Sequence, residues 1–393
     1  YVSVKTGAWY DVWDEDVSGQ HPSTIRINCL LGPKYTRRYN DIVDARVFIK
    51  HGDFESAKKL MDGKLAKYLD DPTIAKALSS ALKIAVNSVY GLTFASFPNA
   101  FRDPRNTDNI VAKMGELFMI DLMYEVERRG FDVVHIKTDS IKIPWATPEL
   151  IDFVWSFGKS YGYNFEHEYH FDRICLVNKA AFIAKISDRK DINGDDAGKW
   201  YPKAAQFQHP YVFKTLFTHE DICFDDLCEF KAVSKGSIYL DMNEKMPDVE
   251  EYENELAKSA KAYRDGKLSD ISYDEIKARL EPLIEKGHSY KFVGRVGLFC
   301  PIKKGFGGGK LIRIQDDKPS AINGTKGYRW LESETVSQLG MKNAIDTSYH
   351  DKLAEDAKEA VSKYTDFESF VNGDPLAQYM NVPESADDEV PFA

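Results

Sequence analysis

Residues 83–91 combine side chains that can bind a charged, planar ligand. If this segment is helical, a rotation of 100° per residue places a cation, an amide, a phenol and a gap on one stripe. The stripe consists of Lys83, Asn87, Tyr90 and Gly91. These groups suit a nucleoside triphosphate, which has negative phosphates and a flat base. An amphipathic core helix is the alternative, anchored by the apolar residues Ile84, Ala85, Val86 and Val89.

Two acidic segments flank this stripe in chain order. Residues 16–25 read Asp-Val-Ser-Gly-Gln-His-Pro-Ser-Thr-Ile, and residues 135–143 read His-Ile-Lys-Thr-Asp-Ser-Ile-Lys-Ile. Together the three segments resemble motifs A, B and C of the family B DNA polymerases, whose patterns are D-x-x-S-L-Y-P-S-I-I, K-x-x-x-N-S-x-Y-G and Y-x-D-T-D-S. The middle motif matches at every fixed position. The resemblance extends over about residues 8–245 and is nearest to phage-type members of the family.

The resemblance implies a site for nucleotidyl transfer with two divalent cations. Asp16 and Asp139 occupy the positions of the family's two metal-ligating aspartates, and the backbone carbonyl of Val17 occupies the position of a further metal ligand. Mg²⁺ is the expected ion, with Mn²⁺ as an alternative, because hard cations bind carboxylate oxygens. Taken singly, Asp16 can instead belong to a solvated acidic loop, and Asp139 can be an ordinary turn residue.

The same resemblance implies roles for the helical stripe. Lys83 would be catalytic as well as nucleotide-binding, since it would hold the incoming triphosphate and protonate the leaving pyrophosphate. Asn87 would hydrogen-bond the nucleotide, and Tyr90 would lie beside the nascent base pair.

The family usually adds an Arg-x-x-x-Lys pair on the preceding helix. Arg46 and Lys50 fit that spacing, which puts both cations on one face of a helix and makes them candidate nucleotide-binding residues. Lys58 and Lys59 lie nearer to the distance that the family usually shows, so they remain an alternative. A solvated charged face is a second alternative.

Three departures from the family patterns bear on the chemistry. Lys137 replaces the first aspartate of the third motif, which lowers the negative charge near Asp139. His21 replaces the tyrosine that stacks under the sugar and excludes ribonucleotides, so discrimination against ribonucleotides is expected to be weaker. Ser18 and Gly19 replace the usual order of a residue followed by serine. These changes affect sugar selectivity and rate more than fold.

Candidate DNA contacts lie in two places. Lys179 and the aromatic residue three positions later fall where the family contacts the minor groove of the primer–template, although a core strand explains them equally well. The second place is a glycine-rich basic segment that lacks the spacing of a P-loop and so suits charge neutralisation of a phosphate backbone. Its candidate DNA-binding residues are Lys303, Lys304, Lys310 and Arg313.

Composition describes a folded globular protein with segregated charge. The chain of 393 residues is 43% hydrophobic and has a net charge of −10, yet positive charge dominates residues 301–330 and negative charge the segment after residue 373. No stretch is long and apolar enough for a membrane span. The five cysteines are dispersed without a zinc spacing, which favours the cytoplasm, or the host cytoplasm for a viral protein.

Local signals place these motifs on expected elements. Residues 1–30 read as a strand, a turn and a short helix, and residues 40–69 as helix broken near Gly52 and Gly63. Asp71 and Pro72 begin a helix that runs to Gly91. Further helices are expected over residues 107–129, 148–160, 250–265, 273–286 and 348–364. Strands are expected over residues 131–136 and 141–144, and over 181–186 and 200–208 with a turn at 193–194.

These elements and the resemblance predict an α+β, right-hand polymerase with an antiparallel-sheet palm, two-helix fingers and a mostly helical thumb. Residues 1–39 and 93–245 would form the palm, 40–92 the fingers, 246–372 the thumb and 373–393 an acidic C-terminal tail.

The expected activity is DNA-templated addition of dNTPs to a primer 3′-hydroxyl, in phage DNA replication, with primer–template DNA as partner. The alternatives are a non-catalytic polymerase-like DNA-binding subunit and a polymerase or primase that tolerates ribonucleotides. The first residue is Tyr1, and the first motif begins almost at once. We therefore expect the family's exonuclease on a separate chain, if it exists, and a processivity factor is a further candidate partner.

Overall fold

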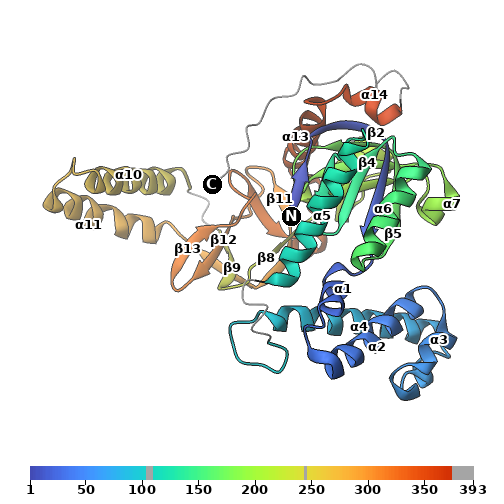
Figure 1. The fold of residues 1–393 in the computed structure, drawn as a ribbon. Coiled ribbons are helices and arrows are strands. Elements are labelled where there is room, and N and C mark those ends of the chain that lie inside the picture. Colours follow the sequence, from blue (N-terminus) through green and yellow to red (C-terminus); the bar gives the residue numbers. More distant parts are fainter. Residues whose placement is uncertain (103–108, 243–245, 374–393) are drawn as a thin grey trace. The chain divides into compact units, whose positions relative to one another are not determined.

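The computed structural model describes residues 1–102, 109–242 and 246–373, which divide into two compact units. The first unit comprises Tyr1–Ala204 together with the segment that begins at Ala360, and the second comprises Ala205–Glu359. Helices and strands occur in both units (Figure 1). The acidic tail predicted from the sequence lies, from residue 374 on, outside the described residues.

An antiparallel sheet of seven strands is the centre of the first unit. Its order is β1-β3-β4-β2-β5-β6-β7. The strands are β1 (Val2–Val4), β2 (Gly7–Val17), β3 (His135–Lys137), β4 (Ser140–Pro144), β5 (Phe165–Leu176), β6 (Phe182–Ile186) and β7 (Trp200–Lys203). The combination of this sheet with separate helices confirms the predicted mixture of helices with an antiparallel sheet.

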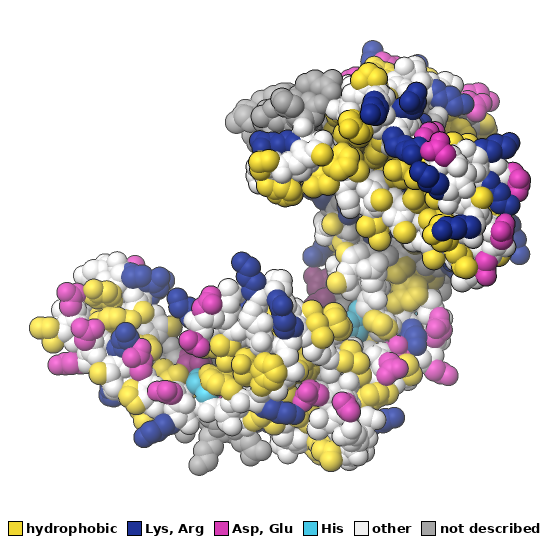
Figure 2. All heavy atoms as spheres, turned by 90° about the horizontal axis from the view of Figure 1, so that it is seen from below, with side chains coloured by type: hydrophobic (Ala, Val, Ile, Leu, Met, Phe, Trp, Pro, Cys, Tyr) yellow, Lys and Arg dark blue, Asp and Glu magenta, His cyan; other side chains and the backbone are white. Residues whose placement is uncertain are grey.

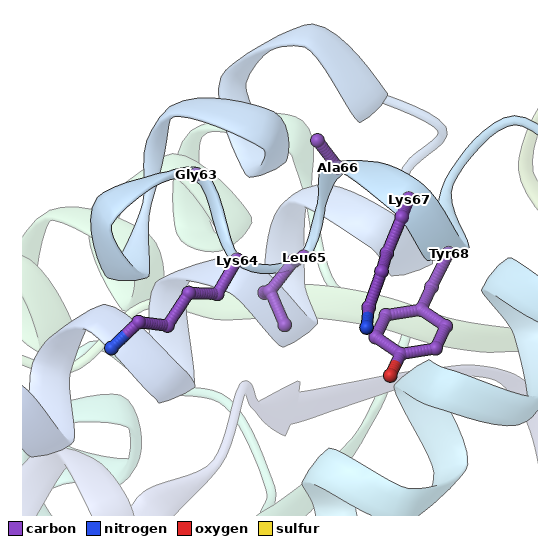
Figure 3. Close-up of a pocket in the computed structure, with 6 residues that line it drawn as sticks. All are labelled: Gly63, Lys64, Leu65, Ala66, Lys67 and Tyr68. Carbon is purple, nitrogen blue, oxygen red and sulfur yellow. The ribbon is translucent and has the colours of Figure 1, made fainter.

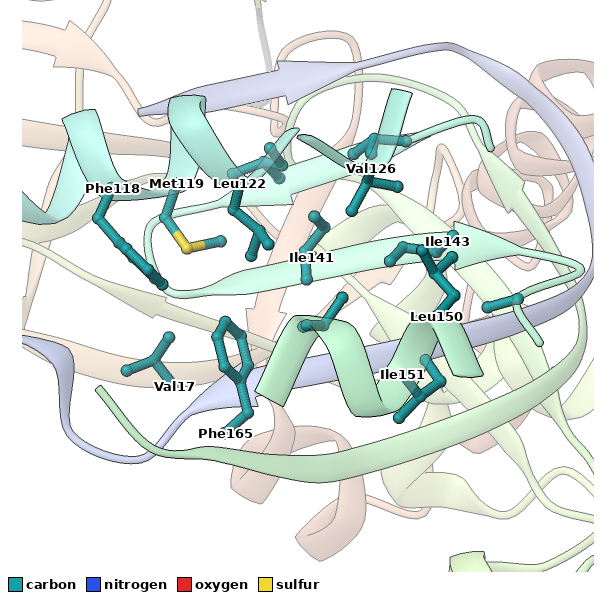
Figure 4. Close-up of a cluster of buried hydrophobic side chains, with 14 of the residues drawn as sticks. Val17, Phe118, Met119, Leu122, Val126, Ile141, Ile143, Leu150, Ile151 and Phe165 are labelled. Atoms are coloured by element: carbon teal, nitrogen blue, oxygen red, sulfur yellow. The ribbon is translucent and has the colours of Figure 1, made fainter. Parts of the chain in front are cut away.

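Two helices, α5 (Ile110–Arg128) and α6 (Pro148–Tyr161), bury one face of this sheet. Thr147 caps the start of α6, and Gly162 with φ of +85° ends it in the left-handed conformation that favours glycine. Figure 4 shows the core between these helices and the sheet. Its members include Val17, Phe118, Met119, Leu122, Ile141, Ile143, Ile151 and Phe165.

A buried carboxylate fixes the orientation of β2 in this core. Glu15 is fully buried and accepts hydrogen bonds from Trp155 Nε1 of α6 at 2.7 Å and from His167 Nδ1 of β5 at 2.6 Å. Because successive side chains of a strand point to opposite faces, Asp14 and Asp16 point to the face away from these helices.

A helical subdomain is inserted between β2 and α5. It consists of α1 (Gln20–Ile27), α2 (Gly32–Lys50), α3 (Phe54–Lys59) and α4 (Pro72–Thr93). Asp71 accepts hydrogen bonds from the backbone N–H of Thr73 and Ile74, which confirms the predicted start of α4 at Pro72. The anchoring face of α4 was predicted only in part, because Val86 is buried whereas Ile84 is 69% exposed and Ala85 is also exposed.

A shallow surface pocket lies between α3 and α4 in sequence. It is lined by the six consecutive residues Gly63, Lys64, Leu65, Ala66, Lys67 and Tyr68 (Figure 3). Lys67 Nζ lies 4.8 Å from the centre of the Tyr68 ring, so the ammonium group of Lys67 makes a cation–π contact with its neighbour in the chain. The pocket contains none of the residues that the sequence assigns to chemistry.

The connection between β6 and β7 differs from the predicted hairpin turn. The two strands pair as expected, but α7 (Lys190–Asn193) and a short 3₁₀ turn lie between them. Asn193 is buried and donates from Nδ2 to the carbonyl oxygens of His170 and Ser187. Its side chain therefore fastens the connection to β5, a contact that the Asn-Gly signal does not specify.

The second unit contains more strand than the sequence predicted. Helices α10 (Met246–Arg264), α11 (Asp270–Lys286) and α13 (Ser348–Ser362) are present as expected. The shorter helices α9 (Pro210–Phe213), α12 (Ser333–Gln338) and, in the first unit, α14 (Phe367–Asn372) were not predicted. Helix α8 (Ala205–Gln208) replaces the last part of the strand expected over residues 200–208, because β7 ends at Lys203. Between α11 and α12, however, the chain forms β10 (Tyr290–Gly294), β11 (Val296–Ile302), β12 (Lys310–Gln315), β13 (Lys318–Ala321) and β14 (Arg329–Glu332). The segment from residue 246 to 372 therefore contains an unpredicted group of strands between its expected helices.

The boundary expected at residue 245 also falls inside this unit. Strand β8 (Glu229–Ala232) pairs with β11, and β9 (Ser237–Asp241) pairs with β10 and β12. These backbone ladders join residues before 245 to residues after it, so the compact unit begins at Ala205 instead.

The described surface carries both signs of charge. On the face drawn in Figure 2, Lys and Arg side chains are interspersed with Asp and Glu side chains. No helix among the described residues is long and apolar enough to cross a membrane.

Candidate active site

Asp16 and Asp139 lie at the same end of two neighbouring strands. Asp16 is near the end of β2, and Asp139 lies in the turn between β3 and β4. Asp16 pairs in register with Ser140, and the backbone N–H of Val17 donates to the carbonyl oxygen of Asp139 at 2.9 Å. Thr138 has a φ of +60°, which makes the turn tight. Strand pairing thus brings together two aspartates that are far apart in sequence.

The two carboxylates repel each other in a partly buried setting. Burial, followed by the negative charges of Asp139 and Glu168, raises the pKa of Asp16 to about 8. Burial also raises the pKa of Asp139, against a smaller lowering by its own backbone N–H and by His21. Two carboxylates that are held close together repel each other. A hard divalent cation bound between them would relieve this repulsion, so the pair suits such an ion.

Sequence reasoning missed two further acidic residues on this face. Asp14 lies two residues before Asp16 on β2, and Glu168 lies on β5 where the pairing shifts register opposite Asp14 and Glu15. Both charges act on Asp16. The alternation Asp14-x-Asp16 is a signal in the sequence for one shared face, but the bulge that brings in Glu168 depends on strand pairing and has no local signal.

Lys142 partly compensates this negative charge. Its Nζ lies 2.7 Å from Asp14 Oδ2, and both side chains are almost completely buried. The other oxygen, Asp14 Oδ1, is buried without a hydrogen-bond partner in the described part of the chain. A buried acceptor without a donor is the kind of group that a cation or an ordered water satisfies, so the residues present fit a metal site.

His21 and Tyr90 connect the carboxylates to α4. Their rings lie 4.1 Å apart between centroids, His21 on α1 and Tyr90 on α4. Burial lowers the pKa of His21, while the carboxylate of Asp139 acts to raise it. Asn109 Nδ2 donates to the Tyr90 hydroxyl at 3.1 Å. The structure therefore brings four of the predicted site residues together: Asp16, Asp139, His21 and Tyr90.

The residues predicted to bind the triphosphate lie further along α4 from this group. Lys83 and Asn87 are exposed and lie on the same stripe as Tyr90, as expected. A rise of 1.5 Å per residue puts Lys83 about 10 Å along the helix axis from Tyr90, a span that a triphosphate can bridge.

Of the two cations predicted on α2, Lys50 reaches the strand next to Asp16. Lys50 Nζ lies 2.5 Å from Glu166 Oε2, and Glu166 pairs in register with Asp16. Burial would raise the pKa of Glu166, but hydrogen bonds from Lys50 and Ser18 lower it overall. Arg46, one turn earlier on the same helix, is half-buried.

The predicted DNA-binding residues occupy different places. Lys179 is exposed in the loop between β5 and β6 of the first unit. Lys303, Lys304, Lys310 and Arg313 belong to the second unit. The glycine-rich segment beside them is partly a packing device, since a Cβ on Gly309 would lie 2.5 Å from the carbonyl oxygen of Asp241. Close pairing with the neighbouring backbone thus explains part of the glycine content attributed to a phosphate-binding loop.

Gln20 is a further site residue without a sequence signal. It is buried, and its Nε2 donates to the carbonyl oxygen of Thr138 at 3.2 Å and to that of Gly115 at 3.5 Å. A Cβ on Gly115 would lie 2.6 Å from Gln20 Oε1, so this glycine leaves room for the amide. Gln20 therefore holds the turn that carries Asp139.

Comparisons with known proteins add a weak likeness. No protein-family model matches the chain, and no curated protein matches it. A solved structure to which the chain is similar is the family B DNA polymerase from the hyperthermophilic archaeon Pyrobaculum calidifontis, with a TM-score of 0.44 and 12% identity. The alignment covers 92% of this chain and 46% of that chain, so this chain spans about half the length of that protein. A likeness of this extent does not by itself establish fold or function, and the residues of the site must carry any assignment.

The raised pKa of Asp16 makes a stability prediction for the metal-free protein. The folded state holds the proton up to a pH of about 8, whereas the unfolded chain releases it near the usual carboxyl value. The unfolded state therefore binds fewer protons between these values, and this group costs stability as the pH rises through that window. Asp16→Asn should raise the midpoint of thermal unfolding at pH 8, by about 2–4 °C for each kcal/mol removed.

The measurement is calorimetry of both proteins from pH 4 to pH 8 in the presence of a chelator. The difference between them should shrink toward pH 4, where Asp16 is protonated in the folded state. An Asp16→Asn protein that is less stable than the unaltered chain at pH 8 would contradict the electrostatic account.

Proposed function

We propose that this chain is the catalytic core of a DNA-templated DNA polymerase that resembles family B. The observation that carries the proposal is the convergence of Asp16 and Asp139 on neighbouring strands, together with the His21–Tyr90 pair, which joins α1 to the helix that carries Lys83. Paired carboxylates next to an exposed cationic helix suit transfer of a nucleotide from a triphosphate to a primer 3′-hydroxyl.

In this proposal Asp16, Asp139 and the carbonyl oxygen of Val17 hold two Mg²⁺ ions, or Mn²⁺ in their place. When bound, the ions supply the positive charge that activates the primer hydroxyl and neutralises the triphosphate. The buried Lys142–Asp14 pair supports the strand that carries Asp16. Gln20 keeps the turn of Asp139 in position.

The side chains of α4 and α2 bind the nucleotide. Lys83 holds the phosphates and donates a proton to the leaving pyrophosphate, and Asn87 hydrogen-bonds the nucleotide. Tyr90 and His21 form the floor against which the sugar and the base pair rest. Lys50 exchanges Glu166 for a phosphate oxygen, with Arg46 one turn away.

We further propose functional roles for the predicted segments, although the boundary at residue 245 lies within the compact unit that begins at Ala205. Residues 1–39 and 93–245 act as palm, 40–92 as fingers, 246–372 as thumb and 373–393 as acidic tail. Primer–template DNA contacts Lys179 and the basic residues of the second unit, namely Lys303, Lys304, Lys310 and Arg313. The exposed charge on several of these residues supports contact with phosphate, which needs no base recognition.

Primer extension on a DNA template with Mg²⁺ and dNTPs tests the proposal. Template-dependent extension supports a catalytic core, and omission of Mg²⁺ should abolish it. Tight binding of primer–template without extension under either Mg²⁺ or Mn²⁺ would instead favour a non-catalytic DNA-binding subunit. Extension with rNTPs alone would favour an RNA-making enzyme.

His21 makes a prediction about sugar selectivity. An imidazole packed on Tyr90 leaves more space beneath the sugar than the phenol that the family has at this position, so ribonucleotides should be tolerated. His21→Tyr should lower the use of rNTPs relative to dNTPs by about 10- to 100-fold. The larger tyrosine ring would occupy the space that the 2′-hydroxyl of a ribonucleotide needs.

The measurement is the ratio of kcat/KM for dATP and ATP opposite thymine, in the unaltered protein and the variant. His219→Tyr, at an exposed histidine of the second unit, is the matched control. An unchanged ratio in the His21→Tyr protein would show that His21 does not contact the sugar of the nucleotide.

A further inference from the structure

Two histidines and a glutamate of the second unit form a compact cluster apart from the proposed polymerase residues. His209, Glu229 and His350 each offer a ligand atom, and these atoms lie within 4.8 Å of one another. His209 lies between α8 and α9, Glu229 begins β8, and His350 lies in the first turn of α13. Three segments distant in sequence thus present two imidazoles and a carboxylate to one point.

The cluster is buried and has unused ligand atoms. His350 is fully buried, and neither of its ring nitrogens has a hydrogen-bond partner among the described residues. His209 Nδ1 is likewise buried without a partner in that part of the chain. A buried polar atom without a partner destabilises the folded state, so such atoms require an explanation. An ion beside His209 and Glu229 would bind one of the two His350 nitrogens and so give this buried side chain a partner.

The carboxylate is already oriented for such a role. Glu229 Oε1 lies 2.7 Å from His209 Nε2, while Glu229 Oε2 accepts from Lys231 Nζ at 2.9 Å. The Tyr349 hydroxyl also hydrogen-bonds to Glu229. Lys231 and Tyr349 hold the carboxylate from the outside, as the partners of metal-binding carboxylates do. Oε1, which faces His209, is the oxygen nearest to the point where an ion would bind.

We propose that His209, Glu229 and His350 bind one Zn²⁺ ion in the second unit. Imidazole nitrogens with one carboxylate oxygen suit zinc better than magnesium or calcium, which prefer oxygen alone. As the ion enters, the proton shared between His209 and Glu229 leaves to solvent. Ligands bonded to zinc at 2.0–2.1 Å lie about 3.4 Å apart in a tetrahedron, so His209 and Glu229 must separate by less than about 1 Å.

The role of this ion is structural. It ties His350 of α13 to Glu229 at the start of β8, which lies 121 residues earlier in sequence, and to His209 at the α8–α9 junction, which lies a further 20 residues earlier. Cross-links that close long loops stabilise a fold chiefly at the expense of the unfolded chain. Because Asp16 and Asp139 belong to the other unit, loss of zinc should lower stability without removing the carboxylates proposed for nucleotidyl transfer.

Zinc titration of the chelator-treated full chain tests the proposal. The chain carries Asp16→Asn and Asp139→Asn, so that the carboxylates of the first unit do not compete for the ion. Calorimetric titration with ZnCl₂ should give one ion per chain with a Kd below about 1 μM, within the range expected of a site with three protein ligands. The midpoint of thermal unfolding should rise by about 5 °C or more at a zinc concentration 100-fold above Kd.

Substitutions at the cluster should remove this response. Glu229→Gln and His350→Gln should each weaken zinc binding by at least about tenfold, in line with loss of one ligand. His219→Gln, at an exposed histidine of the same unit, should bind zinc like the parent. No binding by the parent, or binding that both cluster variants retain, would overturn the proposal.

A Co²⁺ spectrum of the parent gives a readout that does not depend on the variants' folding. Two imidazoles and a carboxylate should give tetrahedral or five-coordinate d–d bands without a thiolate charge-transfer band. Cys228 and Cys300 lie 3.4 Å apart between sulfur atoms in the same unit and are the rival ligands. A thiolate band, or an octahedral spectrum, would overturn the assignment to His209, Glu229 and His350.

Discussion

The Asp139→Ala protein should bind primer–template DNA like the unaltered chain and extend the primer more slowly by about 10³-fold or more. Asp139 is one of two aspartates that strand pairing brings to the same end of the sheet, and its pKa is raised mainly by burial. Removing it leaves Asp16 without the second carboxylate needed to hold two cations. DNA binding should persist because the residues proposed to contact DNA are basic residues elsewhere in the chain.

Single-turnover extension and a DNA-binding titration on the same preparations measure the two effects. Asp139→Asn keeps the size of the side chain and should be nearly as slow, which separates loss of charge from loss of packing. Asp152→Ala, at an exposed position of α6, is the control for removal of a carboxylate as such. Extension by Asp139→Ala at the rate of the Asp152→Ala control would refute the proposed metal site.

The Lys83→Ala protein should lose about 10²-fold in kcat/KM for dNTPs, which corresponds to the loss of a hydrogen bond between charged groups. Lys83 is exposed on α4, so its removal should leave the folded structure and its stability unchanged. The loss should fall on dNTP use and not on DNA binding, because Lys83 is assigned to the triphosphate alone.

Steady-state kinetics at saturating primer–template, with dNTP varied, is the measurement. Lys83→Arg keeps the charge and should recover part of the loss. Lys76→Ala removes an equally exposed cation two turns earlier on the same helix and should behave like the unaltered chain. A Lys83→Ala protein whose kinetics match those of Lys76→Ala would show that α4 does not hold the triphosphate.

The elements with strong local signals could be predicted from sequence. Asp71 and Pro72 begin α4 as the capping pattern requires, and a strand that carries Asp16 and a turn at Asp139 are present in the segments where they were expected. Strands β10 and β11 were not predicted, although Tyr290, Phe292, Val296 and Leu298 occupy alternate positions, because their pairing with β9, β8 and β14 is decided by distant parts of the chain.

The parts of the site that could not be predicted depend on long-range register. Glu168 reaches the face of Asp16 through a bulge in β5, and Lys142 meets Asp14 because β4 pairs with β2. Nothing in the segments around His209, Glu229 or His350 forecasts that they meet. Local patterns indicate which residues share one element, whereas the tertiary fold decides which elements share a site.

Helix α1 touches both halves of the proposed chemistry, and this has a mechanical consequence. At one end of its first turn Gln20 holds the backbone of Thr138, beside Asp139, and the next residue, His21, packs on Tyr90 of α4. A ligand that displaces α4 must either break the contact between the His21 and Tyr90 rings or move α1 with α4. A movement of α1 would in turn strain the turn that carries Asp139. If α4 binds a nucleotide as proposed, a displacement of α4 would reach Asp139 through the His21–Tyr90 contact and Gln20, so a poorly fitting nucleotide would misalign the carboxylates before any bond is made.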